Sequence, residues 1–289
     1  MAGPYDHLIG KDLGSGRSSW DRDRAQLYAV GVGAGLDDNL KEQQFTTDNT
    51  PGVTQQVLPT MLAIMGTEGA WMGQLEMGGD PRYPAGIVHG DHSIRLERPI
   101  PTEGAVDWTR KVVGIYDKGS GAMVVVEWRM TLADSGAYLG ASRMGLFAIG
   151  RGGFGGPRNP PDEQPWAKPD RAPDLTVSNA IGLNQSLIYR LLGDKNPHGT
   201  DMGHAKTDGF DRPVFYGLGT FGVAGRALLG ALCDGDAARF RRIDGRFSKP
   251  VHPGDRLETY IWRTEEGAVF QTYANNERIV LDRGLFHFV

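Results

Sequence analysis

The sequence predicts an α+β protein that contains two copies of one module, each an antiparallel sheet wrapped around a central helix. Three observations lead to this fold class. In each half, a nearly uncharged helix-like segment precedes four strand-like runs, and each half carries a basic-proline phrase between two strands. A segment rich in glycine and proline separates the halves, so a duplicated module is the simplest account.

The first half begins with a charged and then apolar run at residues 20–31, which predicts a short helix followed by a glycine-rich turn. Residues 57–73 are nearly uncharged, with Pro59 near their start, and predict the central helix of this module. Four strand-like runs follow, at residues 89–96, 105–115, 123–132 and 139–149. Successive antiparallel strands behind one helix are typical of a hot-dog module.

The second half repeats this order around a loop and a long apolar helix. An amphipathic helix is predicted by apolar residues at helical spacing, namely Leu187, Ile188, Leu191 and Leu192. Gly193 ends this helix, so Asp194 and Asn196 emerge on a loop held by Pro197. Residues 216–233 are dense in Gly, Ala and Leu, which predicts a helix buried within a sheet, whose first free N–H groups can bind a developing oxyanion.

The second set of strand-like runs lies at residues 239–247, 256–263, 268–274 and 278–288. The two basic-proline phrases are Arg98-Pro99-Ile100-Pro101 and Lys249-Pro250-Val251-His252-Pro253. Residues 150–174 hold five glycines and six prolines, a composition typical of a linker. We therefore expect an N-terminal module at residues 1–150, a linker at 151–175 and a C-terminal module at 176–289.

The loop and the start of the apolar helix resemble a known family signature. Thirteen residues match it without a gap: Tyr189, Arg190, Leu191, Gly193, Asp194, Asn196, Pro197, Gly209, Phe210, Pro213, Gly217, Leu218 and Thr220. This signature is that of the MaoC-like dehydratase family, hydratase-2 type, the (R)-specific enoyl-CoA hydratases in their bacterial double hot-dog form. The resemblance also extends to the linker and the first module.

The resemblance implies (R)-specific hydration of a 2-enoyl-CoA, or dehydration of a 3-hydroxyacyl-CoA, of the kind found in fatty-acid or steroid side-chain β-oxidation. It further implies a homodimer, no cofactor, and a first module that lacks the catalytic motif and accepts bulky acyl chains. The acyl group itself is not predicted. Two alternatives remain open: another reaction on an acyl-CoA, and a non-catalytic acyl-CoA-binding or partner subunit.

The same resemblance implies the site residues. Each of them also has a purely structural interpretation. Asp194 would take a proton from water, although an Asp in a Gly-Asp turn also braces a loop. Asn196 would orient the site, or merely form the turn before proline. The Gly217 N–H would bind the thioester oxygen, or Gly217 would serve helix packing. Lys249 is a candidate for the CoA phosphates.

Two positions depart from the signature, and both hold a histidine in the family: one is Gly199 and the other is Tyr216. A displaced His198 is expected to face solvent, unless Gly199 lets the loop bring His198 or His204 to the water. Tyr216 would donate a hydrogen bond to the thioester oxygen, or pack beside its neighbour. The family pattern predicts impaired activity, Asp194 as essential, and a gain of activity in Gly199→His if the loop keeps the family geometry.

Composition excludes several other functions. The net charge of −4 and the lack of a basic run argue against binding to nucleic acid or to a membrane surface. A single cysteine, Cys233, excludes an intrachain disulfide and a cysteine zinc cluster, and no metal site is predicted. Neither a signal peptide nor a long apolar run occurs, so a cytoplasmic protein is expected. The glycines at 217, 219 and 222 match a dinucleotide motif, but only strands follow them.

Overall fold

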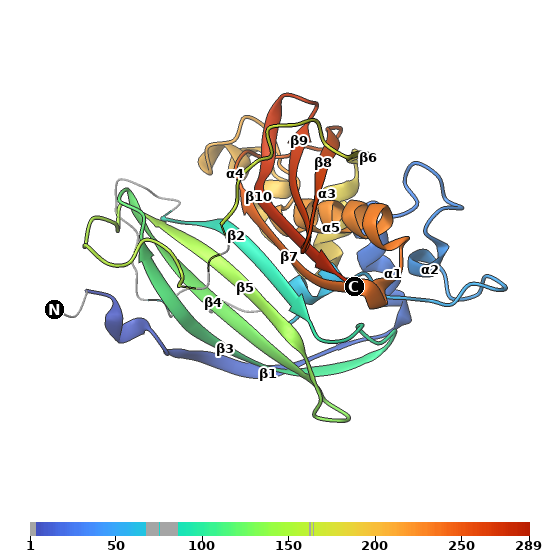
Figure 1. The fold of residues 1–289 in the computed structure, drawn as a ribbon, viewed down its shortest axis with the longest axis horizontal. Helices are drawn as coiled ribbons and strands as arrows, with labels where there is room; N and C mark the ends of the chain where they lie inside the picture. Colours follow the sequence, from blue (N-terminus) through green and yellow to red (C-terminus); the bar gives the residue numbers. More distant parts are fainter. Residues whose placement is uncertain (1–3, 68–74, 76–85, 162, 164) are drawn as a thin grey trace.

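The computed structural model describes residues 4–67, 75, 86–161, 163 and 165–289 (Figure 1). The ten strands formed by these residues belong to one antiparallel sheet, in the order β1-β3-β4-β5-β2-β7-β10-β9-β8-β6. The strands are β1 Asp12–Trp20, β2 Ile87–Leu96, β3 Gly104–Asp117, β4 Gly121–Leu132, β5 Tyr138–Ile149, β6 Leu175–Ala180, β7 Phe240–Phe247, β8 Arg256–Thr264, β9 Gly267–Ala274 and β10 Arg278–Phe288. The eight predicted strands are present, and β1 and β6 add one edge strand to each half.

The helices gather beside the C-terminal strands (Figure 1). The α-helices are α1 Arg22–Gly31, α2 Gln43–Thr46, α3 Gln185–Tyr189, α4 Met202–Thr207 and α5 Gly217–Cys233, and the 3₁₀ helices used below are η2 Pro59–Ile64, η4 Arg190–Leu192 and η5 Pro197–Gly199. The helix α5 packs against β6, β7, β8, β10 and η2. Helix α5 is thus the predicted central helix of the second module, buried by the sheet that curves around it.

The central helix predicted at residues 57–73 of the first module is wrong over its described part. There the chain forms only the short 3₁₀ helix η2, and residues 68–73 lie outside the described residues. Pro59 opens η2 as expected, and all six of its side chains are buried. The apolar pattern therefore identified a buried segment correctly, but apolar periodicity alone does not distinguish 3₁₀ from α geometry.

The two halves join edge to edge along β2 and β7, where Ile94 lies opposite Ile243. Helix α5 also crosses this junction, because Arg226 donates to the Val32 carbonyl and pairs with Glu42 at 2.5 Å. One continuous sheet with a shared helix layer is the double hot-dog arrangement that the repeated sequence pattern predicts.

Residues 150–174 run as a loop that is bonded to both halves of the sheet. The N–H groups of Gly153 and Gly155 donate to the Asp117 carboxylate, at 2.8 and 2.7 Å. The Trp166 indole donates to the Gly284 carbonyl at 2.9 Å. The connection between the halves is therefore held in place by specific hydrogen bonds.

Small residues let α5 approach the first half closely. A Cβ added to Gly225 would lie 2.4 Å from the Thr60 methyl group of η2, and one added to Gly222 would lie 2.5 Å from Val32. By contrast, a Cβ at Gly230 on the same helix meets nothing within 4 Å. The glycines at 222 and 225 are thus needed for contact between the halves, whereas Gly230 is not.

The same substitution in α5 should therefore have opposite effects at two positions. We expect Gly225→Ala to destabilise the protein by about 1–3 kcal/mol, since the new methyl group overpacks the junction. We expect Gly230→Ala to stabilise it by about 0.5–1 kcal/mol, since alanine favours the helix. Urea unfolding of both variants beside the parent measures the two shifts. Equal shifts would contradict the close approach at Gly225.

Candidate active site

The loop that carries Asp194 is fixed from several sides. Gly193 has a φ of +124°, a conformation that side chains disfavour, and it turns the chain out of η4. Arg24 of α1 donates to the Leu192 carbonyl at 3.0 Å, and the Lys195 ammonium donates to the Arg190 carbonyl at 2.7 Å. Sequence patterns predicted this loop, and the structure adds the anchor from the first half.

Asp194 is half-buried, and its Oδ1 accepts the Asn196 N–H at 3.1 Å. Burial raises the pKa of the Asp194 carboxyl, while the Asn196 N–H and the nearby His198 act in the opposite direction. A raised pKa makes a carboxylate a better proton acceptor near neutral pH. The environment of Asp194 is therefore suited to a general base.

Asn196 contributes to the shape of the loop through two contacts. Its side-chain oxygen accepts the His198 N–H at 3.2 Å and caps η5, and its carbonyl accepts the Tyr216 hydroxyl at 3.0 Å. The side chain is otherwise exposed. These contacts agree with the turn-forming interpretation and leave the amide group accessible from solvent.

Gly217 is the first residue of α5 and is exposed, although the helix behind it is buried. Among the described residues, no side chain caps this helix start. Its first N–H groups carry the positive end of the helix dipole. A carbonyl oxygen placed at Gly217 would therefore meet backbone donors that are ready to stabilise negative charge.

Tyr216 fills the space beside Gly199. It is 1% exposed, stacks on Tyr189 at 5.4 Å between ring centroids, and donates its hydroxyl proton to the Asn196 carbonyl. A Cβ on Gly199 would lie 2.6 Å from Cζ and 2.8 Å from Oη of Tyr216. The two departures from the family signature are therefore sterically coupled, because the phenol occupies the place of a side chain at 199.

His198 is less exposed than expected. Its side chain is 21% exposed and packs on Phe210 and Tyr216, with ring centroids 6.1 and 5.6 Å away. Burial lowers the pKa of His198, and the strongest opposing influence is the charge of Asp194. His198 lies in the short helix η5, whose start is capped by the Asn196 side chain.

His204 lies on α4 and is more exposed than His198, at 44% of its side chain. The structure adds Asp208, which was not predicted, between the two histidines. Its Oδ2 is 3.5 Å from Nδ1 of His198 and 3.8 Å from Nε2 of His204. The i,i+4 spacing of His204 and Asp208 is a helical signal that could have identified the pair from sequence.

Lys249 lies on the exposed segment that borders the start of α5. On one side of it, the Phe247 ring is 3.5 Å from the position of a Cβ on Gly217. On the other side, Val251 forms a β-bridge with Phe215. The fold thus brings Lys249 to the same end of α5 as Gly217.

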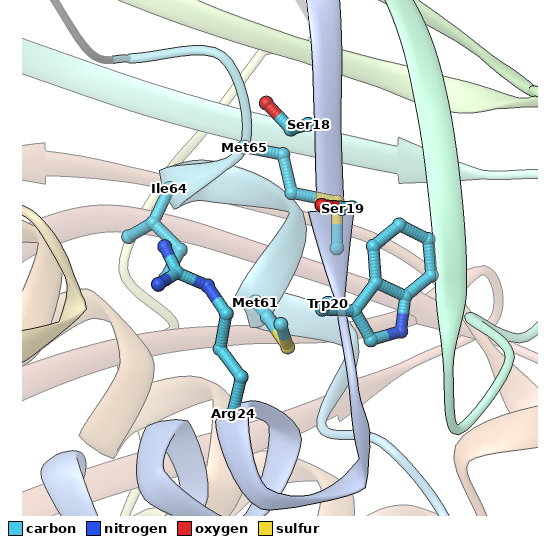
Figure 2. Close-up of a pocket in the computed structure, with 7 residues that line it drawn as sticks. All are labelled: Ser18, Ser19, Trp20, Arg24, Met61, Ile64 and Met65. Atoms are coloured by element: carbon cyan, nitrogen blue, oxygen red, sulfur yellow. The ribbon is translucent and has the colours of Figure 1, made fainter.

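A small pocket in the first half lies where β1, α1 and η2 meet (Figure 2). It is lined by Ser18, Ser19, Trp20, Arg24, Met61, Ile64 and Met65. Its free volume of about 10 Å³ holds about one water molecule, so it does not accommodate an acyl chain as it stands. Arg24 connects this pocket with the loop through its bond to Leu192.

Within the described residues, no group of three or more His, Cys, Asp or Glu side chains is arranged to hold a metal ion. No described helix is long and apolar enough to cross a membrane.

Each half of the chain matches the model of a known protein family. Residues 18–150 match the MFE-2 hydratase 2 N-terminal domain, and residues 162–282 match the MaoC like domain. A 3-hydroxyacyl-thioester dehydratase of Mycobacterium tuberculosis is 42% identical over 93% of this chain and 92% of its own length. An enoyl-CoA hydratase of the same organism is 34% identical, over 89% and 88%.

A mouse peroxisomal multifunctional enzyme type 2 is 35% identical over 91% of this chain, which spans only 36% of that larger protein. Among solved structures, a MaoC-like dehydratase from Phytophthora capsici superposes with a TM-score of 0.83 at 27% identity, covering 98% of this chain and 97% of that one. The chain therefore belongs to the MaoC-like dehydratase family, as a double hot-dog protein of the hydratase-2 type that its sequence predicts.

Proposed function

We propose that this protein is a hydro-lyase that adds water to a 2-enoyl-CoA with (R) stereochemistry and catalyses the reverse dehydration. The proposal depends on one observation. Asp194, which is half-buried, and the start of α5, which is exposed and has no side-chain cap, lie on the same segment of the second half. The relatives named as a 3-hydroxyacyl-thioester dehydratase and an enoyl-CoA hydratase support the same reaction class.

In the proposed reaction, Asp194 takes a proton from water as the water oxygen bonds to C3 of the enoyl group. The electrons of the double bond move toward the thioester oxygen, and the Gly217 N–H stabilises the developing enolate. The proton taken from water is then delivered to C2, which completes the 3-hydroxyacyl-CoA and returns Asp194 to its carboxylate form. Tyr216 acts by holding the loop through the Asn196 carbonyl instead of contacting the thioester oxygen.

The homodimer, the cytoplasmic location and the absence of a cofactor remain predictions. Light scattering of the purified protein tests the dimer. A panel of short, long and steroid-linked enoyl-CoAs, with the chirality of each product determined, tests the reaction and identifies the acyl group. Formation of the (S)-alcohol, or no turnover of any of these thioesters, would contradict the proposal.

The family has a histidine at the positions of Gly199 and Tyr216. Two alternative functions therefore also need a test: another reaction on an acyl-CoA, and a non-catalytic acyl-CoA-binding or partner subunit. Another acyl-CoA reaction would appear as turnover without hydration. A non-catalytic subunit would bind acyl-CoA in a calorimetric titration and leave it unchanged.

Lys249 is proposed to contact the CoA phosphates. We expect Lys249→Ala to raise KM by about two- to five-fold with little change in kcat, as an exposed charge contact contributes about 0.2–1 kcal/mol. Steady-state kinetics with a CoA substrate and with the matching pantetheine thioester, which lacks the nucleotide, measure this effect. An equal rise in KM for both substrates would contradict a contact to the nucleotide phosphates.

A further inference from the structure

Three features hold the His198 imidazole in one position. Its backbone N–H donates to the Asn196 side chain, and its carbonyl accepts the Val214 N–H at 3.1 Å. Its ring is enclosed by Phe210 and Tyr216. At its Nδ1 edge lies the Asp208 carboxylate, 3.5 Å away. A surface histidine without a function would not need to be held by so many contacts.

Asp208 is itself held at the end of α4. The start of this helix is capped by Asp201, whose Oδ1 accepts the His204 N–H at 2.6 Å, and the Asp208 N–H donates to the His204 carbonyl at 3.0 Å. The Asp208 side chain is 26% exposed, so part of its charge is shielded from water. The end of α4 therefore places a carboxylate at the Nδ1 edge of the His198 imidazole.

The imidazole lies in the field of two carboxylates. Asp194 and Asp208 each raise the pKa of His198 against the lowering effect of burial. A carboxylate at Nδ1 selects the tautomer with a proton on Nδ1, which leaves Nε2 as the reactive nitrogen and stabilises the imidazolium when it forms. Catalytic hydrogen bonds are often long before substrate binds, so 3.5 Å is compatible with such a pair.

We propose that Asp208 is a positioning residue that holds His198 as the second proton-transfer group beside Asp194, in place of the imidazole that the family has at position 199. The inference rests on the proposed hydratase function. Asp194 takes the proton from water and passes it to Nε2 of His198. The resulting imidazolium, stabilised by Asp208, gives this proton to C2 and returns to its neutral state, so that no further reactant is needed.

The test compares Asp208→Asn, Asp208→Glu and the control Lys206→Ala with the parent. We expect Asp208→Asn to lower kcat by at least about 10-fold with KM nearly unchanged, since the carboxylate orients a reacting group. Asp208→Glu should restore part of the loss. Lys206→Ala removes an exposed charge from the same helix and should leave kcat within about two-fold of the parent.

The pH profile of kcat/KM separates positioning from a structural role. The Asp208 charge raises the pKa of His198. Removing this charge should therefore shift the part of the kcat/KM profile that reflects titration of His198 to lower pH. If Asp208 had only a structural role, its replacement would change the unfolding midpoint without shifting this part of the pH profile. If Asp208→Asn fails to fold, His198→Gln replaces it, with the same expected loss of kcat.

Two outcomes are clearly distinguishable. If the parent hydrates enoyl-CoA and loses activity in Asp194→Asn, while Asp208→Asn and His198→Gln keep the parent kcat and pH profile, the positioning role is overturned and the hydratase function stands. If the parent hydrates none of the enoyl-CoAs in the panel, the proposed function fails, and the role of Asp208 in it fails too.

Discussion

Asp194→Asn is expected to lower the hydration rate by about 10²- to 10⁴-fold, which is the usual effect of removing one positioned acid-base group. The amide cannot take a proton from water at neutral pH. Its side-chain oxygen can still accept the Asn196 N–H, which Oδ1 of Asp194 accepts at 3.1 Å in the parent. The loop should therefore keep its shape, so that the loss falls on kcat and not on folding.

A matched control is Asp211→Asn, which removes an exposed carboxylate from the same segment. Its kinetics should equal those of the parent. Unfolding midpoints of both variants show whether the protein remains folded at the assay temperature. Unchanged turnover in a folded Asp194→Asn variant would exclude Asp194 as the general base and would leave the proposed mechanism without a proton acceptor.

Much of the fold could be predicted from sequence, because its signals are local. The strands after residues 89 and 239 alternate or run apolar over lengths typical of a sheet, and α5 is nearly free of charge over residues 217–233. The catalytic loop carries Gly193 where a positive φ is needed. Each of these features is decided by neighbouring residues, so the order of the elements follows directly from the chain.

The edge strands and the side-chain environments could not be predicted from the sequence. β1 and β6 pair at the two ends of the sheet, where alternation is weak and tertiary pairing decides the conformation. The buried phenol of Tyr216 and the position of His198 depend on contacts between residues far apart in the sequence, such as the stacking of Tyr216 on Tyr189 and the bond from Tyr216 to Asn196, 20 positions away. A match to a family signature aligns residues, but it does not show which atoms fill the space that a missing side chain leaves.

Gly199→His illustrates this limit. The family pattern alone predicts a gain of activity from this substitution, but the structure predicts a loss. The new Cβ would lie 2.6 Å from Cζ of a fully buried Tyr216, closer than side-chain atoms approach each other in folded proteins. Overpacking of this kind costs about 1–3 kcal/mol and here acts on the loop that positions Asp194.

Gly199→His combined with Tyr216→His should instead be tolerated, because an imidazole lacks the Cζ and hydroxyl atoms that cause the collision. We expect the double variant to exceed the single variant in kcat by about 10²-fold or more, since the carboxylate regains a positioned acid-base partner. Unfolding midpoints should follow the same order. Similar kcat values for the two variants would contradict the steric coupling of positions 199 and 216.

The double variant also tests how this chain compensates for Gly199. In the parent, His198→Ala should lower kcat strongly, because His198 is the histidine whose charge interacts with Asp194. In the double variant, the introduced imidazole at position 199 takes over the proton, so His198→Ala should have little effect. This dependence of one substitution on another is expected of residues that share one proton-transfer role. An equal loss from His198→Ala in the parent and in the double variant would show that the imidazoles at positions 198 and 199 do not share it.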